Sequence, residues 1–100
     1  MDNQSQSLLA GRKGLVVGIA NEHSIAYGCA RMFRACGAEL AVTWLNEKAR
    51  PHVEPLAQEL SAAITMPLDV EQPGAMEAVF DAVRQRWARL DFVLHSIACA

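Results

Sequence analysis

The sequence predicts an α/β fold: a doubly wound parallel sheet with helices on both faces. Two observations predict it. Short apolar runs rich in β-branched residues alternate with longer segments whose apolar residues recur at spacings of three and four. The resulting order is β-α-β-α-β-α-β, and helical crossovers between consecutive strands make those strands parallel.

The first strand is expected within residues 14–19, an apolar run that fits a strand buried on both faces. Ser24 is a good N-cap for the helix that follows, and Gly37 is a good residue to end it. The expected buried stripe of this helix comprises Ile25, Cys29, Met32, Phe33 and Cys36.

Residues 39–44 predict the second strand, and a weaker helix follows with Val53, Leu56, Ala57 and Leu60 on one stripe. Because Pro55 cannot donate a helical hydrogen bond, we expect this helix to be kinked or to begin late. A third strand is expected over residues 63–70, interrupted at Pro67. Pro73 is expected to start a third helix and residues 91–97 to form a fourth strand; the helix stripe is Met76, Val79, Phe80, Val83 and Trp87.

The composition excludes several classes of protein. Nine Lys+Arg against 11 Asp+Glu give a net charge of −2, without the basic excess that nucleic acid binding needs. Hydrophobic residues make up 52% and charged residues 20%, which is typical of a globular chain. No apolar run approaches the ~18–20 residues of a membrane span, and the polar start lacks the apolar core of a secretory signal. We therefore expect a cytoplasmic domain.

The cysteines and histidines predict no metal site. Cys29, Cys36 and Cys99 form no Cys-x-x-Cys pair, and no histidine stands at a matching ligand spacing. Cys29 and Cys36 are interpreted as small apolar core residues. His95 lies inside an apolar strand and is interpreted as a hydrogen-bonded core histidine.

The loop after the first strand, residues 18–25, is a candidate phosphate site. Glycine at 18 permits a close approach of backbone or ligand, and the free amides of the next helix favour an anion. The loop is longer than a G-x-G-x-x-G turn, and the phosphate loop G-x-x-x-x-G-K-[ST] is absent. A plain strand–helix connection therefore accounts for these residues about equally well.

The segment from Gly18 to Gly28, Gly-Ile-Ala-Asn-Glu-His-Ser-Ile-Ala-Tyr-Gly, resembles the cofactor loop of the enoyl-acyl-carrier-protein reductases, divergent members of the short-chain dehydrogenase superfamily. The resemblance extends over nearly all of residues 9–98 and implies a Rossmann-like fold, of which these four strands are the first half. Further stretches resemble the same family in the same order: Gly37–Ala41 leading to Thr43, Val53–Ala57, Leu68–Val70 and Leu90–Ile97.

The resemblance implies an NAD site with a role for each matching position. Gly18, Ala20, Ser24 and Ile25 would bind the pyrophosphate, Asp69 and Val70 the adenine, and Ser96, Ile97 and Ala98 would line the nicotinamide side. Ser24 is equally compatible with a simple N-cap, and Asp69 with a cap of the following helix. Two positions depart from the family pattern: Leu45, near the adenosine ribose, replaces a residue that is often polar, and Ala98 replaces a usual glycine.

The resemblance also implies a function: reduction by NADH of the trans-2 double bond of enoyl thioesters on acyl carrier protein, in fatty acid biosynthesis, by a homotetramer. The family's Tyr-x6-Lys pair lies further downstream. Here Tyr27 is the sole tyrosine and Lys13 and Lys48 the sole lysines, so we expect no catalytic residue in this chain. Residues 1–8 are then a polar leader and residues 9–100 the N-terminal part of a dinucleotide-binding domain, truncated after the fourth strand.

Two alternatives stay open from the residues alone. One is another short-chain reductase that acts on a carbonyl substrate, and the other is a non-catalytic nucleotide-binding α/β module. NADH is favoured over NADPH because no basic residue stands at 45–47 beside the expected ribose site, where a 2′-phosphate would call for one.

Overall fold

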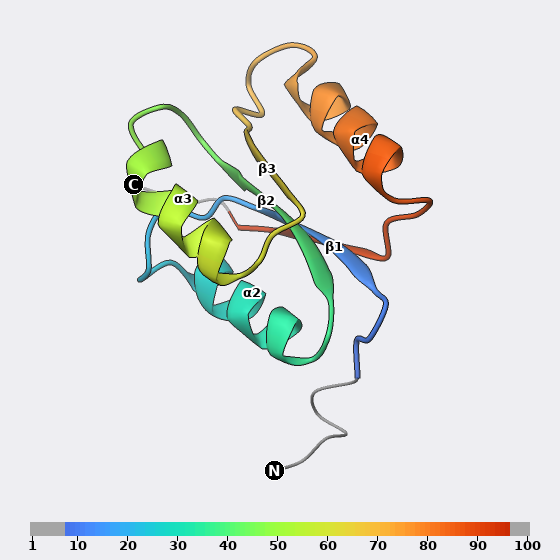
Figure 1. Cartoon of the computed structure of the whole chain (residues 1–100). Coiled ribbons are helices and arrows are strands. Elements are labelled where there is room, and N and C mark those ends of the chain that lie inside the picture. The colour runs from blue at the N-terminus through green and yellow to red at the C-terminus, as the bar shows by residue number, and fades with distance from the viewer. Residues whose placement is uncertain (1–7, 97–100) are drawn as a thin grey trace.

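The computed structural model describes residues 8–96. Within them, strands and helices alternate along the chain (Figure 1). All neighbouring strands are parallel, in the order β3-β2-β1-β4. This arrangement confirms the predicted α/β class. The elements are β1 (Lys13–Val17), α2 (Ile25–Ala35), β2 (Glu39–Trp44), α3 (Arg50–Glu59), β3 (Ile64–Pro67), α4 (Ala75–Arg86) and β4 (Phe92–His95).

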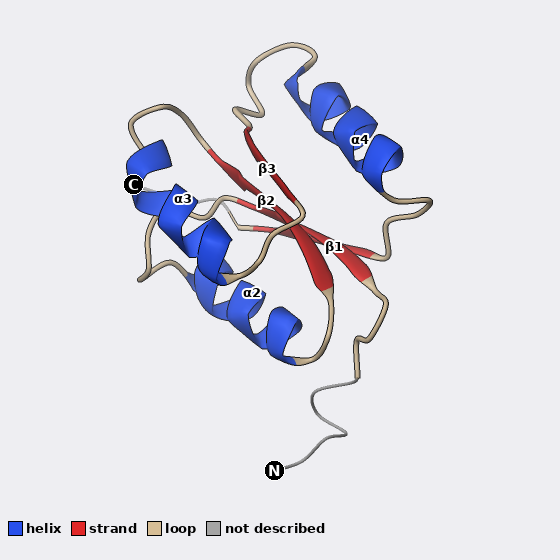
Figure 2. Ribbon diagram, viewed as in Figure 1, coloured by secondary structure: helices blue, strands red, loops and turns tan. Residues whose placement is uncertain are grey.

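The sheet lies between two helical layers. Helices α2 and α3 cover one face, and α4 covers the other (Figure 2). In β1, Val16 packs into the core beneath α2 and α3, whereas Leu15 and Val17 pack beneath α4. The first strand is therefore buried on both faces, as predicted. None of the helices within residues 8–96 is long and apolar enough to cross a bilayer.

Helix α2 buries a different face from the predicted one. Its buried residues are Ala26, Tyr27 and Ala30, whereas Ile25 and Met32 are 78% and 63% exposed. Alanines bring the helix backbone close to the sheet, and their small side chains give a weak periodic signal that the bulkier residues obscured. The other members of the predicted stripe are half-buried: Cys29, Phe33 and Cys36.

Helix α3 and strand β3 differ in detail from their predictions. The helix begins at Arg50, so it does not begin late, and it continues through Pro55 with Val53 and Ala57 buried. Strand β3 ends at Pro67 instead of continuing to residue 70. Because β3 is an edge strand of the described sheet, the missing N–H of Pro67 is tolerated there.

The third predicted helix and the fourth predicted strand are both present, in shorter form. Helix α4 starts at Ala75, after Gly74 in the left-handed conformation, and not at Pro73. It buries Val79 and Val83 as predicted. Strand β4 covers Phe92–His95, and Ile97 lies outside the described residues.

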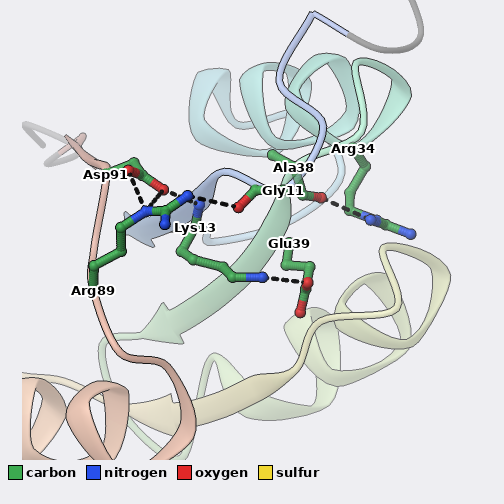
Figure 3. A network of polar contacts seen from close by, with 7 residues as sticks. All are labelled: Gly11, Lys13, Arg34, Ala38, Glu39, Arg89 and Asp91. Carbon is green, nitrogen blue, oxygen red and sulfur yellow. Dashed lines mark hydrogen bonds and ion pairs between the residues drawn. The ribbon is translucent and has the colours of Figure 1, made fainter.

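A polar network ties β1 to its neighbours at the amino ends of the strands (Figure 3). The Lys13 backbone N–H donates to Asp91 Oδ2 at 2.8 Å, and Arg89 Nε donates to Asp91 Oδ1 at 2.9 Å. These donors hold the pKa of the Asp91 carboxyl below its ordinary value. The Lys13 ammonium pairs with Glu39 on β2 and lowers the pKa of that carboxyl in the same way.

The strand order reverses between β1 and β4. The chain places β2 and β3 successively on one side of β1 and then returns to add β4 on the other side. In open α/β sheets, ligands bind beyond the carboxyl ends of the strands at such a switch point. The edge opposite the polar network is therefore where a binding site is expected.

Candidate functional site

A cleft of about 440 Å³ opens at the carboxyl edge of the sheet. The loops that follow all four described strands contribute to it, so the topology itself assembles the lining. Both apolar and polar side chains are present. The lining residues are Val17, Gly18, Ile19, Ala20, Leu45, Asn46, Ala49, Leu68, Asp69, Val70, Glu71, His95 and Ser96.

Gly18 lies at the switch point, where β1 and β4 end side by side. The Ser96 N–H donates to the Val17 carbonyl at 3.0 Å, which brings the Ser96 carbonyl against Gly18. A Cβ atom built on Gly18 would lie 1.8 Å from that oxygen, and the Gly18 φ of +101° is one that other residues rarely adopt. The close approach predicted at Gly18 is therefore made by protein backbone.

Ser24 caps helix α2, as one of its two interpretations predicted. Its Oγ accepts from the Tyr27 N–H at 3.3 Å and donates to the Asn21 carbonyl at 2.9 Å. Its hydroxyl hydrogen is thus directed to Asn21. Ser24 and Ile25 stand outside the lining of the cleft, whereas Ala20 from the same loop is part of it.

The loop between β2 and α3 forms one wall of the cleft. Leu45, 54% exposed, lines it together with Asn46. Glu47 and Lys48 are not part of the lining, and Glu47 Oε1 lies 3.4 Å from Arg50 Nη1. Arg50 also pairs with Glu54 at 2.9 Å. Both charged groups of this Glu47–Arg50 pair are therefore engaged away from the cleft.

The loop after β3 supplies the acidic groups. Asp69 Oδ1 accepts from the Glu71 N–H at 3.0 Å, and its carbonyl accepts from the Gln72 N–H at 2.9 Å. These bonds form a turn, and the N-cap position of α4 is Gly74, so the interpretation of Asp69 as a helix cap is wrong. Asp69 and Glu71 both line the cleft, and no Lys or Arg does in the part of the chain that the structure describes.

The end of β4 completes the lining with Ser96 and His95. His95 is exposed and has no hydrogen-bond partner for its ring among residues 8–96, so the interpretation as a bonded core histidine is wrong. Its position explains the difference, because β4 is an edge strand of the described sheet. Ile97 and Ala98 lie outside the described residues, and their predicted roles stay predictions.

The structure adds lining residues that the sequence did not single out, above all Asn46 and Glu71. Asn46 follows its predicted strand end by two residues and Glu71 by one. That position was a signal that could have found them. Across residues 8–96, no group of three or more His, Cys, Asp or Glu side chains could hold a metal ion.

The cleft fits a dinucleotide in its chemistry. It combines apolar surface from Ile19, Leu45 and Val70 with polar groups at Asn46 and Asp69, which is the usual character of a cofactor site. It also stands at the switch point, beside the glycine at the end of β1.

Comparison with known proteins assigns the family. Residues 18–100 match the family model described as enoyl-(acyl carrier protein) reductase. The chain belongs to this family. It is 48% identical over 90 residues to an enoyl-[acyl-carrier-protein] reductase [NADH] 2 of Rhizobium meliloti, covering 90% of this chain and 34% of that protein.

Two solved structures of the family superpose closely on this chain. FabI from Candidatus Liberibacter asiaticus has a TM-score of 0.87 at 40% identity, covering 93% of this chain and 36% of that one. The enoyl-(acyl-carrier-protein) reductase from Anaplasma phagocytophilum, solved in complex with NAD, has a TM-score of 0.80 at 40% identity, covering 86% of this chain and 33% of that one. The chain therefore spans about a third of the length of the relatives it matches.

Proposed function

We propose that the protein containing this chain is an NADH-dependent enoyl-acyl-carrier-protein reductase of fatty acid biosynthesis. The observation that carries the proposal is the cleft at the β1–β4 switch point. Six of the residues that resemble the family's cofactor site line it: Gly18, Ala20, Leu45, Asp69, Val70 and Ser96. Family membership and the NADH-dependent relatives support it. Residues 9–100 would be the N-terminal part of its dinucleotide-binding domain, and residues 1–8 a polar leader.

The proposed cofactor contacts follow the walls of the cleft. Gly18 and Ala20, with the helix start at Ser24 and Ile25, would bind the pyrophosphate. Because the Ser24 hydroxyl hydrogen is already donated to Asn21, the free amides at the start of α2 would supply most of this binding. The adenine would lie against Asp69 and Val70, the ribose near Leu45, and the nicotinamide toward Ser96, Ile97 and Ala98.

We propose NADH as the preferred cofactor on electrostatic grounds. A 2′-phosphate adds close to two negative charges, and the described lining offers it two carboxylates, Asp69 and Glu71, and no cation. Arg50, which would have to turn inward to bind the phosphate, is held by Glu47 and Glu54. We expect kcat/KM with NADH to exceed that with NADPH on one enoyl substrate, and a clear advantage for NADPH would contradict this.

The remaining parts of the proposal concern the whole protein. Its substrate would be an enoyl chain on acyl carrier protein, its assembly a homotetramer, and its location the cytoplasm. The family's Tyr-x6-Lys pair would come from outside these 100 residues, so we expect the isolated chain to reduce no enoyl thioester. Because these residues make up about a third of the relatives' length, we also expect the isolated chain to fold poorly.

The decisive experiment uses the complete gene product. Fluorescence titration with NADH tests whether the protein binds the cofactor. Turnover of a trans-2-enoyl thioester separates an enoyl reductase from a carbonyl reductase and from a non-catalytic nucleotide-binding module. We expect both binding and turnover. NADH binding with reduction of a ketone and no enoyl turnover would support the carbonyl alternative, and measurable turnover by residues 1–100 alone would contradict the placement of the catalytic pair.

A further inference from the structure

A single side-chain hydrogen bond joins helices α2 and α3 within residues 8–96. The Tyr27 hydroxyl donates to Glu59 Oε1 at 2.8 Å. Tyr27 stands in the first turn of α2, whereas Glu59 is the last residue of α3. The bond therefore ties the start of one helix to the end of the other, on the face of the sheet that both cover (Figure 1).

The tyrosine that makes this bond is held on several sides. Its side chain is 8% exposed and belongs to the same core cluster as Val53 and Ala57 of α3. The Arg31 guanidinium lies 5.9 Å from the centre of its ring. The hydrogen bond to Glu59 and burial raise the pKa of the Tyr27 hydroxyl above its ordinary value of 10.0, so the hydroxyl remains a donor at neutral pH. The close packing leaves the ring little freedom to turn.

The backbone of Tyr27 closes the helical turn that the proposed function assigns to the pyrophosphate. Its N–H donates to Ser24 Oγ at 3.3 Å. Between these two residues stand Ile25 and Ala26, whose N–H groups have no acceptor in the described part of the chain. These free amides are the donors that an anion at the start of α2 would meet. Ser24 fixes one end of the turn and Tyr27 the other, so a shift of the tyrosine moves both amides.

We infer that Glu59 is a positioning residue for the cofactor: through Tyr27 it holds the first turn of α2 where the free amides bind the pyrophosphate. This assignment rests on the proposed function. Glu59 is not part of the cleft, so its carboxylate makes no contact with the cofactor and acts only through the tyrosine. A turn that is fixed in advance binds more tightly, because less freedom is lost when the ligand arrives.

Removal of the bond from either end tests the assignment in the complete gene product. For Glu59→Ala and for Tyr27→Phe, we expect the Kd for NADH to rise about three- to tenfold, the range of one net hydrogen bond. Because both variants lose the same bond, the double variant should bind NADH no more weakly than either single one. Glu59→Gln keeps an acceptor for the hydroxyl, so its Kd should stay within about twofold of the wild-type value.

Two further readouts separate positioning from a purely structural tie. The KM for NADH should rise with the Kd while kcat at saturating NADH stays unchanged, because no reacting group is touched. Adenosine, which lacks the pyrophosphate, should compete for the cleft with the same affinity in every variant. As a control, Glu77→Ala removes an exposed carboxylate from α4, on the opposite face of the sheet, and should leave the Kd for NADH unchanged.

The outcomes distinguish this assignment from the proposed function. A wild-type protein that binds NADH, together with an unchanged Kd in Glu59→Ala and Tyr27→Phe, would overturn the role of Glu59 alone and leave the bond as a tie between helices. Losses that add in the double variant, or a Glu59→Gln protein that binds as weakly as Glu59→Ala, would overturn that role as well. Failure of the wild-type protein to bind NADH would overturn both.

Discussion

A methyl group added at Gly18 should disrupt the junction on which the cleft is built. In Gly18→Ala, the new Cβ would lie 1.8 Å from the Ser96 carbonyl oxygen, whereas ordinary contacts begin near 3.4 Å. The end of β4 must therefore retreat by about 1.6 Å. That movement breaks the 3.0 Å hydrogen bond from the Ser96 N–H to the Val17 carbonyl.

The cost of Gly18→Ala has two separable parts. A positive φ costs a residue with a Cβ about 1–2 kcal/mol, and the lost backbone hydrogen bond costs a further ~0.5–1.5 kcal/mol. We expect a total of about 1.5–3.5 kcal/mol, which corresponds to a Tm roughly 3–14 °C lower in a chain of 150–250 residues. Because both parts are properties of the polypeptide, the loss should be present without cofactor.

The assay is thermal and urea unfolding of the complete gene product without nucleotide, compared with Gly28→Ala. Gly28 lies in helix α2 with no atom within 4 Å of an added Cβ, so alanine there should stabilise by up to ~1 kcal/mol. Opposite signs for the two glycines are expected. A Gly18→Ala protein as stable as the wild type would refute the reasoning, because the Ser96 carbonyl could not then lie against residue 18.

Two further predictions follow from other contacts. Ser24→Ala should lower stability by ~1 kcal/mol through the lost cap. Because that cap also orients the amides at the start of α2, the variant should weaken NADH binding by ~0.5–1.5 kcal/mol, and unchanged affinity in a stable variant would leave Ser24 as an N-cap alone. Because the pKa of Asp91 is lower in the folded protein than its ordinary value of 3.8, the ionised carboxylate stabilises the fold at pH values above 3.8. This stabilisation is lost as the pH falls through the folded-state pKa. Asp91→Asn should therefore reduce the difference in Tm between pH 7 and pH 3. Asp81→Asn, at an exposed side chain of α4, is the control and should retain that difference. Equal pH profiles for wild type and Asp91→Asn would contradict the role of Asp91.

The sequence by itself determined the order and type of the elements. Apolar periodicity and β-branched runs are local properties, so β2 was predicted at its observed bounds, and the cap at Ser24 was read from a single residue. The short motifs that carried the family resemblance are local as well. They indicated which loops form the site because parallel strands bring their carboxyl ends to one edge.

Only the tertiary structure decided which atoms meet at that edge. Gly18 and Ser96 are far apart in the chain. The sequence around Gly18 therefore does not show that the Ser96 carbonyl leaves room only for glycine there. The buried face of α2 was likewise set by how closely alanines let the helix approach the sheet. The position of Asn46 on the cleft, and of Glu47 beside Arg50, depends on side-chain pairing across a loop. Such contacts depend on geometry between elements, which periodicity within one element does not contain.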